Sequence, residues 1–456
     1  MHTRYFRSFF TSMARFMRME TDKPLVFVCG CTGTGKSDLG IEIAKAFDGE
    51  VISADSMQIY KGLDIATNKV TEEEMSGIPH HMMSFYEPSE DRFNVHQFRT
   101  EVLRLIADMQ QRKKLPVIVG GTAYYVESIL YQNYLIDTEQ STSDTIQESL
   151  EKHSTEELYS MLCEIDPESA SLIHRNNRYR VIRALEIFHS TGKKKSEFLA
   201  EQKSKVKDDR NHLGGMLQFK NTLLINLDAK QELLIERLNK RVTKMVKRGL
   251  RHEVEQYYDK YSHSFGSYGV MQSIGIKEFL PYLELNEMER KTKLGDDLFE
   301  EGCEYLKIRT RQYSKKQRNW LYKRILMRSK TREVPAFITL DTSSNFFEEI
   351  VPFAIDYVRE FLAGNDMTQI ASLESHQFIM KLPMTDNMRA LEESDYDTNA
   401  NKLHFCKVCE RDIHGLIHFQ NHIESRAHKK MAVSKKRKEL ASLVETIDSV
   451  LMKANS

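Results

Sequence analysis

Short apolar runs alternate with amphipathic segments in the first third of the chain. Residues 24–29, 51–55 and 115–119 are mainly apolar and have the length of strands buried in a parallel sheet. Between the first two runs, four apolar residues recur at helical spacing: Leu39, Ile43, Ala46 and Phe47. A further strand is expected at 223–227. This alternation predicts an α/β fold with a parallel-sheet core.

The rest of the chain departs from this pattern in two places. Residues 131–215 lack strand signals and are interpreted as an inserted helical domain, and the polar stretch 363–400 is typical of a linker. The predicted order is a leader-like segment (1–20), the first part of the core (21–130), the helical insertion (131–215) and the second part of the core (216–362). An acidic linker (363–400), a small C-terminal domain (401–430) and a basic tail (431–456) follow.

Composition excludes several classes of protein. The chain has 456 residues, of which 40% are hydrophobic and 29% charged, so it is neither collagen-like nor wholly disordered. No run approaches the ~20 apolar residues that span a bilayer, and no membrane role is expected. Six cysteines in so long a chain favour a reducing compartment over a disulfide scaffold. Lys and Arg balance Asp and Glu at 66 each, so only local charge asymmetry is informative.

The N-terminus has the composition of a mitochondrial transit peptide. Residues 1–19 contain no acidic residue and mix phenylalanines with four arginines: Arg4, Arg7, Arg15 and Arg18. Internal starts at Met13, Met17 or Met19 would omit most of this segment, so mitochondrial and cytoplasmic pools are both expected. The alternative is a solvated terminus without targeting function.

The C-terminal region is strongly basic. Residues 401–438 carry ten bases and three acids. The run Lys435-Lys-Arg-Lys438 indicates a nuclear localisation signal or a patch that contacts phosphates, with a merely solvated tail as the alternative.

Within the basic region lies a metal-ligand pattern. Cys406 and Cys409 are followed, after twelve residues, by His422 and His428. Two thiolates and two imidazoles are the donors that tetrahedral Zn²⁺ prefers, and so short a module needs metal to fold. The five-residue spacing between the histidines resembles fingers that bind RNA, although a protein-binding finger remains open. The predicted fold class is thus α/β, with a parallel-sheet core, an inserted helical domain and a C-terminal C2H2 zinc finger.

The first apolar run leads directly into a phosphate-binding loop. Residues 30–37 read Gly-Cys-Thr-Gly-Thr-Gly-Lys-Ser and fit G-x4-G-K-[ST] in the strand–loop–helix context that the motif requires. The backbone amides of such a loop hold a diphosphate at the helix N-terminus, and its Ser hydroxyl binds Mg²⁺. The expected diphosphate-binding residues are Gly30, Thr32, Gly33, Thr34, Gly35, Lys36 and Ser37, the last also as the Mg²⁺ ligand.

A P-loop NTPase places a carboxylate after a neighbouring strand to hold Mg²⁺. The run 115–119 is instead followed by Gly120, Gly121 and Thr122. The run 51–55 does end in an acid. Asp55 can therefore act as a general base or bind Mg²⁺ through water, although an Asx-turn or helix cap is the structural alternative.

At this point the residues resemble the tRNA dimethylallyltransferase (tRNA isopentenyltransferase) family. The resemblance covers about residues 24–325 and includes the P-loop, Ser53 to Lys69, Gly77 to His81, Val119 to Tyr125, Arg180 to Glu186 and Gly275 to Glu278. The appended finger is similar to that of eukaryotic members, which are shared between mitochondria, cytosol and nucleus.

The resemblance implies a reaction. The P-loop would hold dimethylallyl diphosphate, and the prenyl group would pass to N6 of adenosine 37, beside the tRNA anticodon. Asp55 aligns with the proposed base, while Lys36 and Thr122 complete the catalytic set. The residues Asp55, Ser56, Met57, Gln58 and Thr122 align with positions that contact the flipped adenine or the donor. The expected partners are the tRNA anticodon stem-loop and the donor, bound by a monomer.

Some positions depart from the family pattern. Cys31 replaces a proline of bacterial members, and Ser84 replaces an aspartate after the pair His80–His81, which is therefore expected to be structural. Gln272 stands where bacterial members carry an arginine that steadies the leaving group, so Lys277 or a nearby basic residue is expected to share that role.

Three basic stretches are candidates for RNA contact, with solvated helix faces as the alternative. The family resemblance favours RNA. The residues expected to bind tRNA in this way are Arg180, Arg183, Lys244, Lys247, Arg248, Gln272, Lys277 and Arg311. Two other functions remain open on the residues alone: a P-loop kinase that uses ATP, and a zinc-finger RNA-binding protein with an inactive P-loop.

Overall fold

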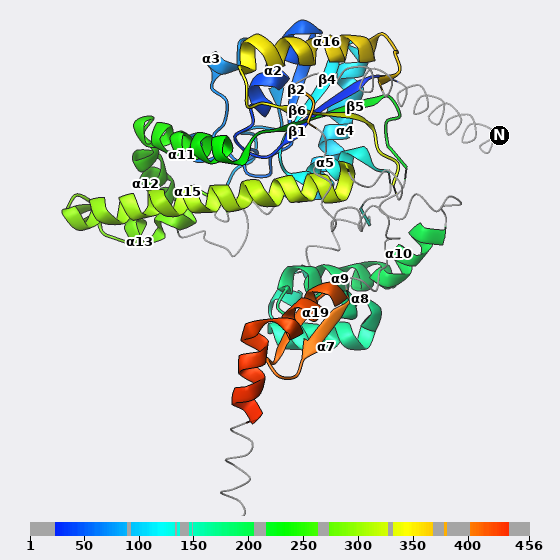
Figure 1. Ribbon diagram of the computed structural model, residues 1–456, viewed down its shortest axis with the longest axis vertical. Helices are drawn as coiled ribbons and strands as arrows, with labels where there is room; N and C mark the ends of the chain where they lie inside the picture. The colour runs from blue at the N-terminus through cyan, green and yellow to red at the C-terminus, as the bar shows by residue number, and fades with distance from the viewer. Residues whose placement is uncertain are drawn as a thin grey trace, which may run out of the picture. The chain divides into compact units, whose positions relative to one another are not determined.

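The computed structural model describes residues 23–88, 93–132, 135–136, 146–147, 149–204, 216–262, 273–326, 332–367, 378–380 and 402–436. The chain forms two compact units (Figure 1). The sheet unit comprises 1–135 and 213–393, and the helical unit comprises 136–212 and 394–456. Of the helices in the described ranges, not one combines the length and apolar character needed to cross a membrane.

The sheet unit is built on six parallel strands in the order β3-β2-β4-β1-β5-β6. Phe27 in the central strand faces Ile118 on one side and Leu224 on the other. The strands are β1 Leu25–Gly30, β2 Gly49–Ser53, β3 His80–His81, β4 Leu115–Val119, β5 Thr222–Asp228 and β6 Ala336–Asp341. The predicted parallel-sheet core is confirmed, and Asp55 lies two residues beyond the end of β2.

Alternate residues of β1 enter two different cores, because successive side chains of a strand point to opposite faces. Val26 and Val28 pack with α2 Lys36–Ala46 and α16 Val351–Leu362. Phe27 instead packs with α4 Val95–Gln111 and α5 Ala123–Leu130. Figure 1 shows these helix pairs on opposite faces of the sheet. Burial on both faces explains why the strands read as continuous apolar runs rather than alternating ones.

A group of helices extends from the sheet. The long helix α15 packs against the end of the sheet by its C-terminal part and against short helices by its N-terminal part, where Phe299 stacks on Phe279 at 5.0 Å between ring centroids. The elements of this group are α11 Gln231–Lys247, α12 Leu250–Tyr261, η4 Lys277–Phe279, α13 Leu280–Leu283, α14 Glu287–Arg290, α15 Lys293–Leu321 and η5 Tyr322–Leu326. Two further short elements of the sheet unit are α3 Glu72–Met75 and η6 Phe346–Ile350, the latter packed against α16.

The helical unit contains the insertion and the finger, which the sequence assigns to separate domains. The insertion has its own apolar core, which includes Leu158, Leu162, Val181 and Leu185. Its helices are α7 Thr155–Ile165, α8 Pro167–Leu172, α9 Arg178–Thr191 and α10 Lys195–Ser204. The finger consists of the hairpin β7 Leu403–Cys406 and β8 Arg411–His414, helix α19 Leu416–Glu424, and a helical segment over 426–436.

Candidate active site and zinc cluster

The P-loop joins β1 to α2 in a conformation that depends on glycine. Gly33 has φ +94°, and a Cβ at this position would lie 2.9 Å from the side chain of Leu238. Within the loop, the Thr34 hydroxyl and the Lys36 ammonium both donate to the carbonyl of Cys31, at 2.8 and 2.9 Å. The loop residues expected to hold a diphosphate are thus brought together at the N-terminus of α2, where backbone amides favour an anion.

Asp55 lies beside this loop. Its Oδ1 accepts a hydrogen bond from the backbone N–H of Met57 at 2.9 Å, so the residue does form an Asx-turn. Burial raises the pKa of Asp55, whereas the Met57 N–H and the positive charge of Lys36 oppose that rise. Burial lowers the pKa of Lys36, and the nearby Arg241 contributes to the lowering. The turn and the chemical role are therefore compatible, because a carboxylate has about four lone-pair sites and can accept backbone N–H groups and still take up a proton.

Thr122 is placed on the other side of Asp55 by the end of β4. Its Oγ1 accepts from the backbone N–H of Ser56 at 3.1 Å and bonds the phenol of Tyr313 on α15. Gln317, one turn further along α15, accepts from the N–H of Thr32 at 2.9 Å and donates to the carbonyl of Gly121 at 3.0 Å. Helix α15 therefore holds the P-loop and the strand end that carries Thr122 in fixed relation.

Arg241 is a site residue that the sequence prediction missed. It extends from α11, and its Nη1 donates to the Oγ1 of Thr32 in the P-loop at 2.6 Å. Burial lowers the pKa of Arg241, and the carboxylates of Asp38 and Asp55 act in the opposite direction. A signal was present in the sequence, because Arg241 shares the apolar face of α11 with Leu234 and Leu238. A charged residue on a buried helix face needs a partner, and here that partner is the phosphate-binding loop.

Two predicted adenine contacts have different environments. The backbone of Met57 supports Asp55. The side chain of Gln58 accepts from the Ser53 hydroxyl at 3.0 Å and donates to the carbonyls of Thr67 and Asn68 at 3.2 and 3.3 Å. Gln58 thus stabilises the loop that follows β2. The pair His80–His81 is structural as expected, since His81 bonds Glu50 at 2.8 Å and His80 bonds the carbonyl of Ile78.

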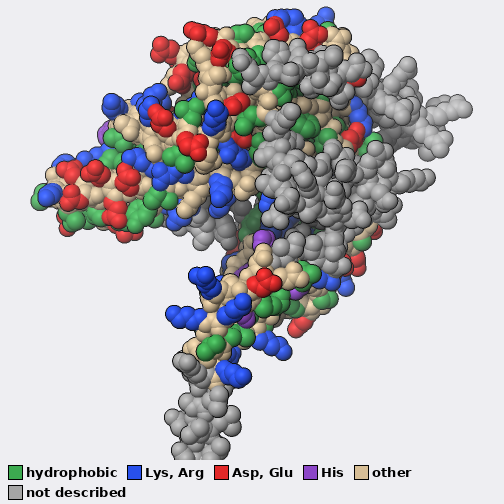
Figure 2. All heavy atoms as spheres, viewed as in Figure 1, with side chains coloured by type: hydrophobic (Ala, Val, Ile, Leu, Met, Phe, Trp, Pro, Cys, Tyr) green, Lys and Arg blue, Asp and Glu red, His purple; other side chains and the backbone are tan. Residues whose placement is uncertain are grey.

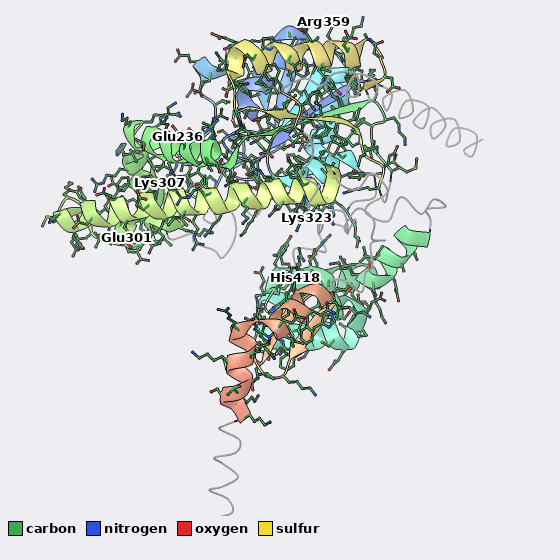
Figure 3. All side chains as sticks on the ribbon, in the orientation of Figure 1. Glu236, Glu301, Lys307, Lys323, Arg359 and His418 are labelled. Carbon is green, nitrogen blue, oxygen red and sulfur yellow. The ribbon has the colours of Figure 1, made fainter. Side chains whose placement is uncertain are left out.

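A second cluster lies in the finger. The donor atoms of Cys406, Cys409, His422 and His428 all lie within 4.8 Å of one another. Nε2 of His422 approaches Nδ1 of His428 at 3.1 Å, and the two sulfurs lie 3.5 and 3.4 Å from that same Nδ1. Two sulfur donors from the hairpin and two nitrogen donors from the following helical segments converge in a way that fits a tetrahedral zinc ion. His418 is exposed on α19 and is not part of the cluster (Figure 3).

Comparison with known proteins assigns the chain that carries the P-loop site and the zinc cluster to a family. The family described as IPP transferase matches residues 58–324, more than half of the chain. The chain belongs to this family. It is 35% identical to the tRNA dimethylallyltransferase of Homo sapiens over 440 residues, which cover 93% of this chain and 89% of that protein. It is 39% identical to the tRNA dimethylallyltransferase of Saccharomyces cerevisiae over 316 residues, covering 68% of this chain and 69% of that protein.

A solved structure shares both fold and sequence with this IPP transferase family member. It is a eukaryotic dimethylallyltransferase acting on tRNA, which aligns with a TM-score of 0.72 and 31% identity and covers 93% of this chain and 100% of that one. The likeness includes most of both units and supports a eukaryotic type of enzyme.

The basic residues expected to contact RNA lie in both units. Lys244, Lys247 and Arg248 are exposed on α11 and at its C-cap, and Arg311 on α15 donates to Asn239 of α11 at 3.0 Å. Figure 2 shows Lys and Arg side chains over this part of the sheet unit. Gln272 lies outside the described residues, whereas Lys277 begins the short helix η4.

In the helical unit, Arg180 and Arg183 lie close enough to Lys195 to influence its charge. Burial, together with the positive charges of Arg180 and Arg183, lowers the pKa of Lys195 to about 8. Arg183 also pairs with Glu186 at 2.6 Å and so stabilises α9. The result is a local excess of positive charge at the start of α9, which favours a phosphate contact.

Proposed function

We propose that this chain transfers the dimethylallyl group of dimethylallyl diphosphate to N6 of adenosine 37 in the tRNA anticodon loop, with release of diphosphate and formation of N6-(dimethylallyl)adenosine. The observation that carries the proposal is the position of Asp55 beside the P-loop. Two cations, Lys36 at the end of the loop and Arg241 on α11, lie near both the loop and this carboxylate. The names of the relatives, tRNA dimethylallyltransferases of eukaryotes, support the same reaction.

The P-loop and its two cations bind the donor and stabilise the leaving group. The amides of residues 30–37 and the charges of Lys36 and Arg241 surround the place where a diphosphate would lie. Negative charge on the diphosphate grows as its bond to the prenyl carbon breaks, so these groups act most strongly in the transition state. Mg²⁺ bound to the Ser37 hydroxyl would supply further positive charge.

Asp55 removes the proton. The lone pair of N6 forms the new bond to the prenyl carbon, the electrons of the broken carbon–oxygen bond leave with the diphosphate, and the surplus proton of the amine passes to the Asp55 carboxylate. A partly buried carboxylate of raised pKa is a better base than an exposed one. The adenine must leave its stack to reach Asp55, because N6 is otherwise enclosed by neighbouring bases.

The same site is poorly suited to a kinase. Strand β5, next to β1, does end in a carboxylate, Asp228. Both of its oxygens are occupied, however, by Arg318, the Tyr322 hydroxyl and the Ala229 N–H. Within the described part of the chain, the carboxylate at this strand end is therefore not available to hold Mg²⁺ for ATP transfer.

The finger bears on how the enzyme would bind tRNA, and the N-terminal segment bears on the compartment in which it would act. A zinc-stabilised finger followed by exposed Lys429, Lys430 and Lys436 supports binding to the phosphate backbone of tRNA (Figure 2). The transit-like residues 1–20 lie outside the described residues, and their composition supports a mitochondrial pool. The basic run at 435–438 supports cytoplasmic and nuclear pools made from internal starts.

The first experiment incubates the purified chain with Mg²⁺, labelled dimethylallyl diphosphate and a tRNA that carries adenines at positions 36 to 38. Label should remain on the RNA and should be lost when adenine 37 is replaced by guanine. A sample that binds both ligands without transfer would overturn the proposal, and phosphate transfer from ATP on the same loop would favour the kinase.

A further inference from the structure

A cavity of about 530 Å³ lies between α15 and the segment that contains η4 and α13. Its volume falls within the range of about 300–1,000 Å³ typical of small-ligand pockets. The α15 wall consists of residues at positions i, i+4, i+7, i+8 and i+11, which share one helix face: Tyr305, Arg309, Gln312, Tyr313 and Lys316. The facing wall consists of Ile274, Lys277, Glu278 and Pro281. Figure 3 marks α15 by Glu301 and Lys307, and η5, which follows it directly, by Lys323.

The lining is basic and aromatic at once. Lys277, Arg309 and Lys316 contribute three positive charges against one carboxylate. That carboxylate, on Glu278, accepts from the backbone N–H of Gly275 at 2.8 Å and so stabilises the wall itself. The ring of Tyr305 is 49% exposed, which leaves a face open for stacking. A cationic pocket with an accessible ring suits a phosphate and a base together.

The cavity adjoins the reacting carboxylate. Tyr313 lines the cavity and is also hydrogen-bonded to Thr122, beside Asp55. A nucleotide in the cavity would therefore be a near neighbour of an adenine presented to Asp55. A prenyl chain does not suit three charged side chains, and a free anion would make no use of the Tyr305 ring.

We propose that this cavity binds one unpaired nucleotide adjacent to the reacting adenosine, with its base stacked on Tyr305 and its phosphate held by Lys277, Arg309 and Lys316. This inference rests on the proposed transfer to RNA and adds a specificity subsite to it. Stacking accepts any base but requires an unpaired one, because a paired base does not expose its face. The subsite thus selects single-stranded loops.

The test measures steady-state transfer to an anticodon stem-loop with the full chain. For Tyr305→Ala, the KM for RNA should rise about 5- to 50-fold, in line with the loss of one base-stacking contact, while the KM for dimethylallyl diphosphate stays within about twofold. Tyr305→Phe, which keeps the ring, should behave as the wild type. Arg309→Ala should raise the KM for RNA more than Lys291→Ala, which removes the same charge from an exposed position at the C-cap of α14, outside the cavity.

Stem-loops with a single abasic residue on either side of the target identify the nucleotide. One of these RNAs should already show a raised KM with the wild type and should lose its sensitivity to Tyr305→Ala. If Tyr305→Ala matches the wild type, or if every RNA stays equally sensitive to it, the subsite is wrong although the transfer reaction stands. If the wild type transfers nothing, the proposed function itself is wrong.

Discussion

The guanidinium of Arg241 donates to the hydroxyl of Thr32 at 2.6 Å, across 209 positions of sequence. The contact brings a cation from α11 onto the P-loop that follows β1. It exists because β5, which precedes α11, is paired directly with β1. The leaving-group role that we assign to Arg241 follows from this contact.

Replacement of Arg241 by Gln should lower kcat by about 100-fold or more, because one cation that stabilises the departing diphosphate is lost. The affinity for RNA should change little, and the affinity for inorganic diphosphate should fall. Lys240→Ala is the matched control, since Lys240 is exposed on the same helix and pairs with Glu236 (Figure 3). Equal loss of activity in both variants would contradict a specific role for Arg241.

Asp55→Asn should separate activity from stability. The amide oxygen can still accept from the Met57 N–H, so the turn is retained. Loss of the base should reduce kcat by about 10²- to 10⁴-fold without change in RNA affinity. Because burial raises the folded-state pKa of Asp55, ionisation of this carboxyl costs stability as the pH rises above its unfolded-state pKa, so in that range the variant should melt at the same or a higher temperature.

The pH dependence of the wild type gives an independent check on Asp55. Its raised pKa predicts that kcat falls as the pH is lowered through that value, since the protonated acid cannot take the N6 proton. A kcat that stays flat through the acid range, in enzyme that remains folded, would rule out Asp55 as the base.

Zinc removal should unfold the finger without unfolding the sheet unit. Cys409→Ser removes one of four donors, so metal analysis should fall from about one zinc per chain towards zero. Binding to full-length tRNA should weaken and become less salt-dependent, because fewer phosphates are contacted. His418→Ala, a histidine of the same helix outside the cluster, should retain both zinc and tRNA affinity. Unchanged tRNA binding after zinc loss would indicate a finger that docks protein.

Arg175 should hold the finger against the insertion within the helical unit. Its Nε donates to Asp412 at 2.6 Å, and its guanidinium lies 5.7 Å from the ring of Phe405 and 6.0 Å from that of Tyr159. The Asp412 side chain is only 6% exposed, so Arg175→Ala leaves a buried carboxylate unpaired. Amide exchange over 402–436 should accelerate about 3- to 10-fold with zinc content unchanged. Arg426→Ala, an exposed charge in the finger, should leave the exchange rates unaltered.

Acid should weaken one charge cluster of the sheet unit. Hydrogen bonds from Arg112 and His81 lower the pKa of Glu50 to about 2, against an ordinary 4.5. Its contribution to stability is therefore present above about pH 4.5 and is lost as the pH falls towards 2. Glu50→Gln should cost roughly 2–3 kcal/mol of unfolding free energy at pH 7, and the difference from wild type should shrink over that window. Glu42→Gln, which breaks an exposed pair with Lys45, should cost under about 1 kcal/mol.

The sequence by itself determined what depends on neighbours in the chain. Strand β1, the glycines of the P-loop and helix α2 follow one another directly, and the zinc donors are set by spacing within a short segment. Such features depend on local backbone geometry and on the periodicity of apolar side chains, and both can be read directly from the order of residues. The helical nature of the insertion was predictable for the same reason.

Only the tertiary structure decided which distant side chains meet. Arg241 reaches Thr32, Gln317 links the P-loop to Gly121, and Tyr313 meets Thr122 because the strand order places β4 and β5 on either side of β1 and lays α15 across their ends. The occupation of Asp228 by Arg318 is likewise a long-range contact. Periodicity identifies a buried helix face but does not say what that face will touch, because sheet order is set by the packing of the whole domain.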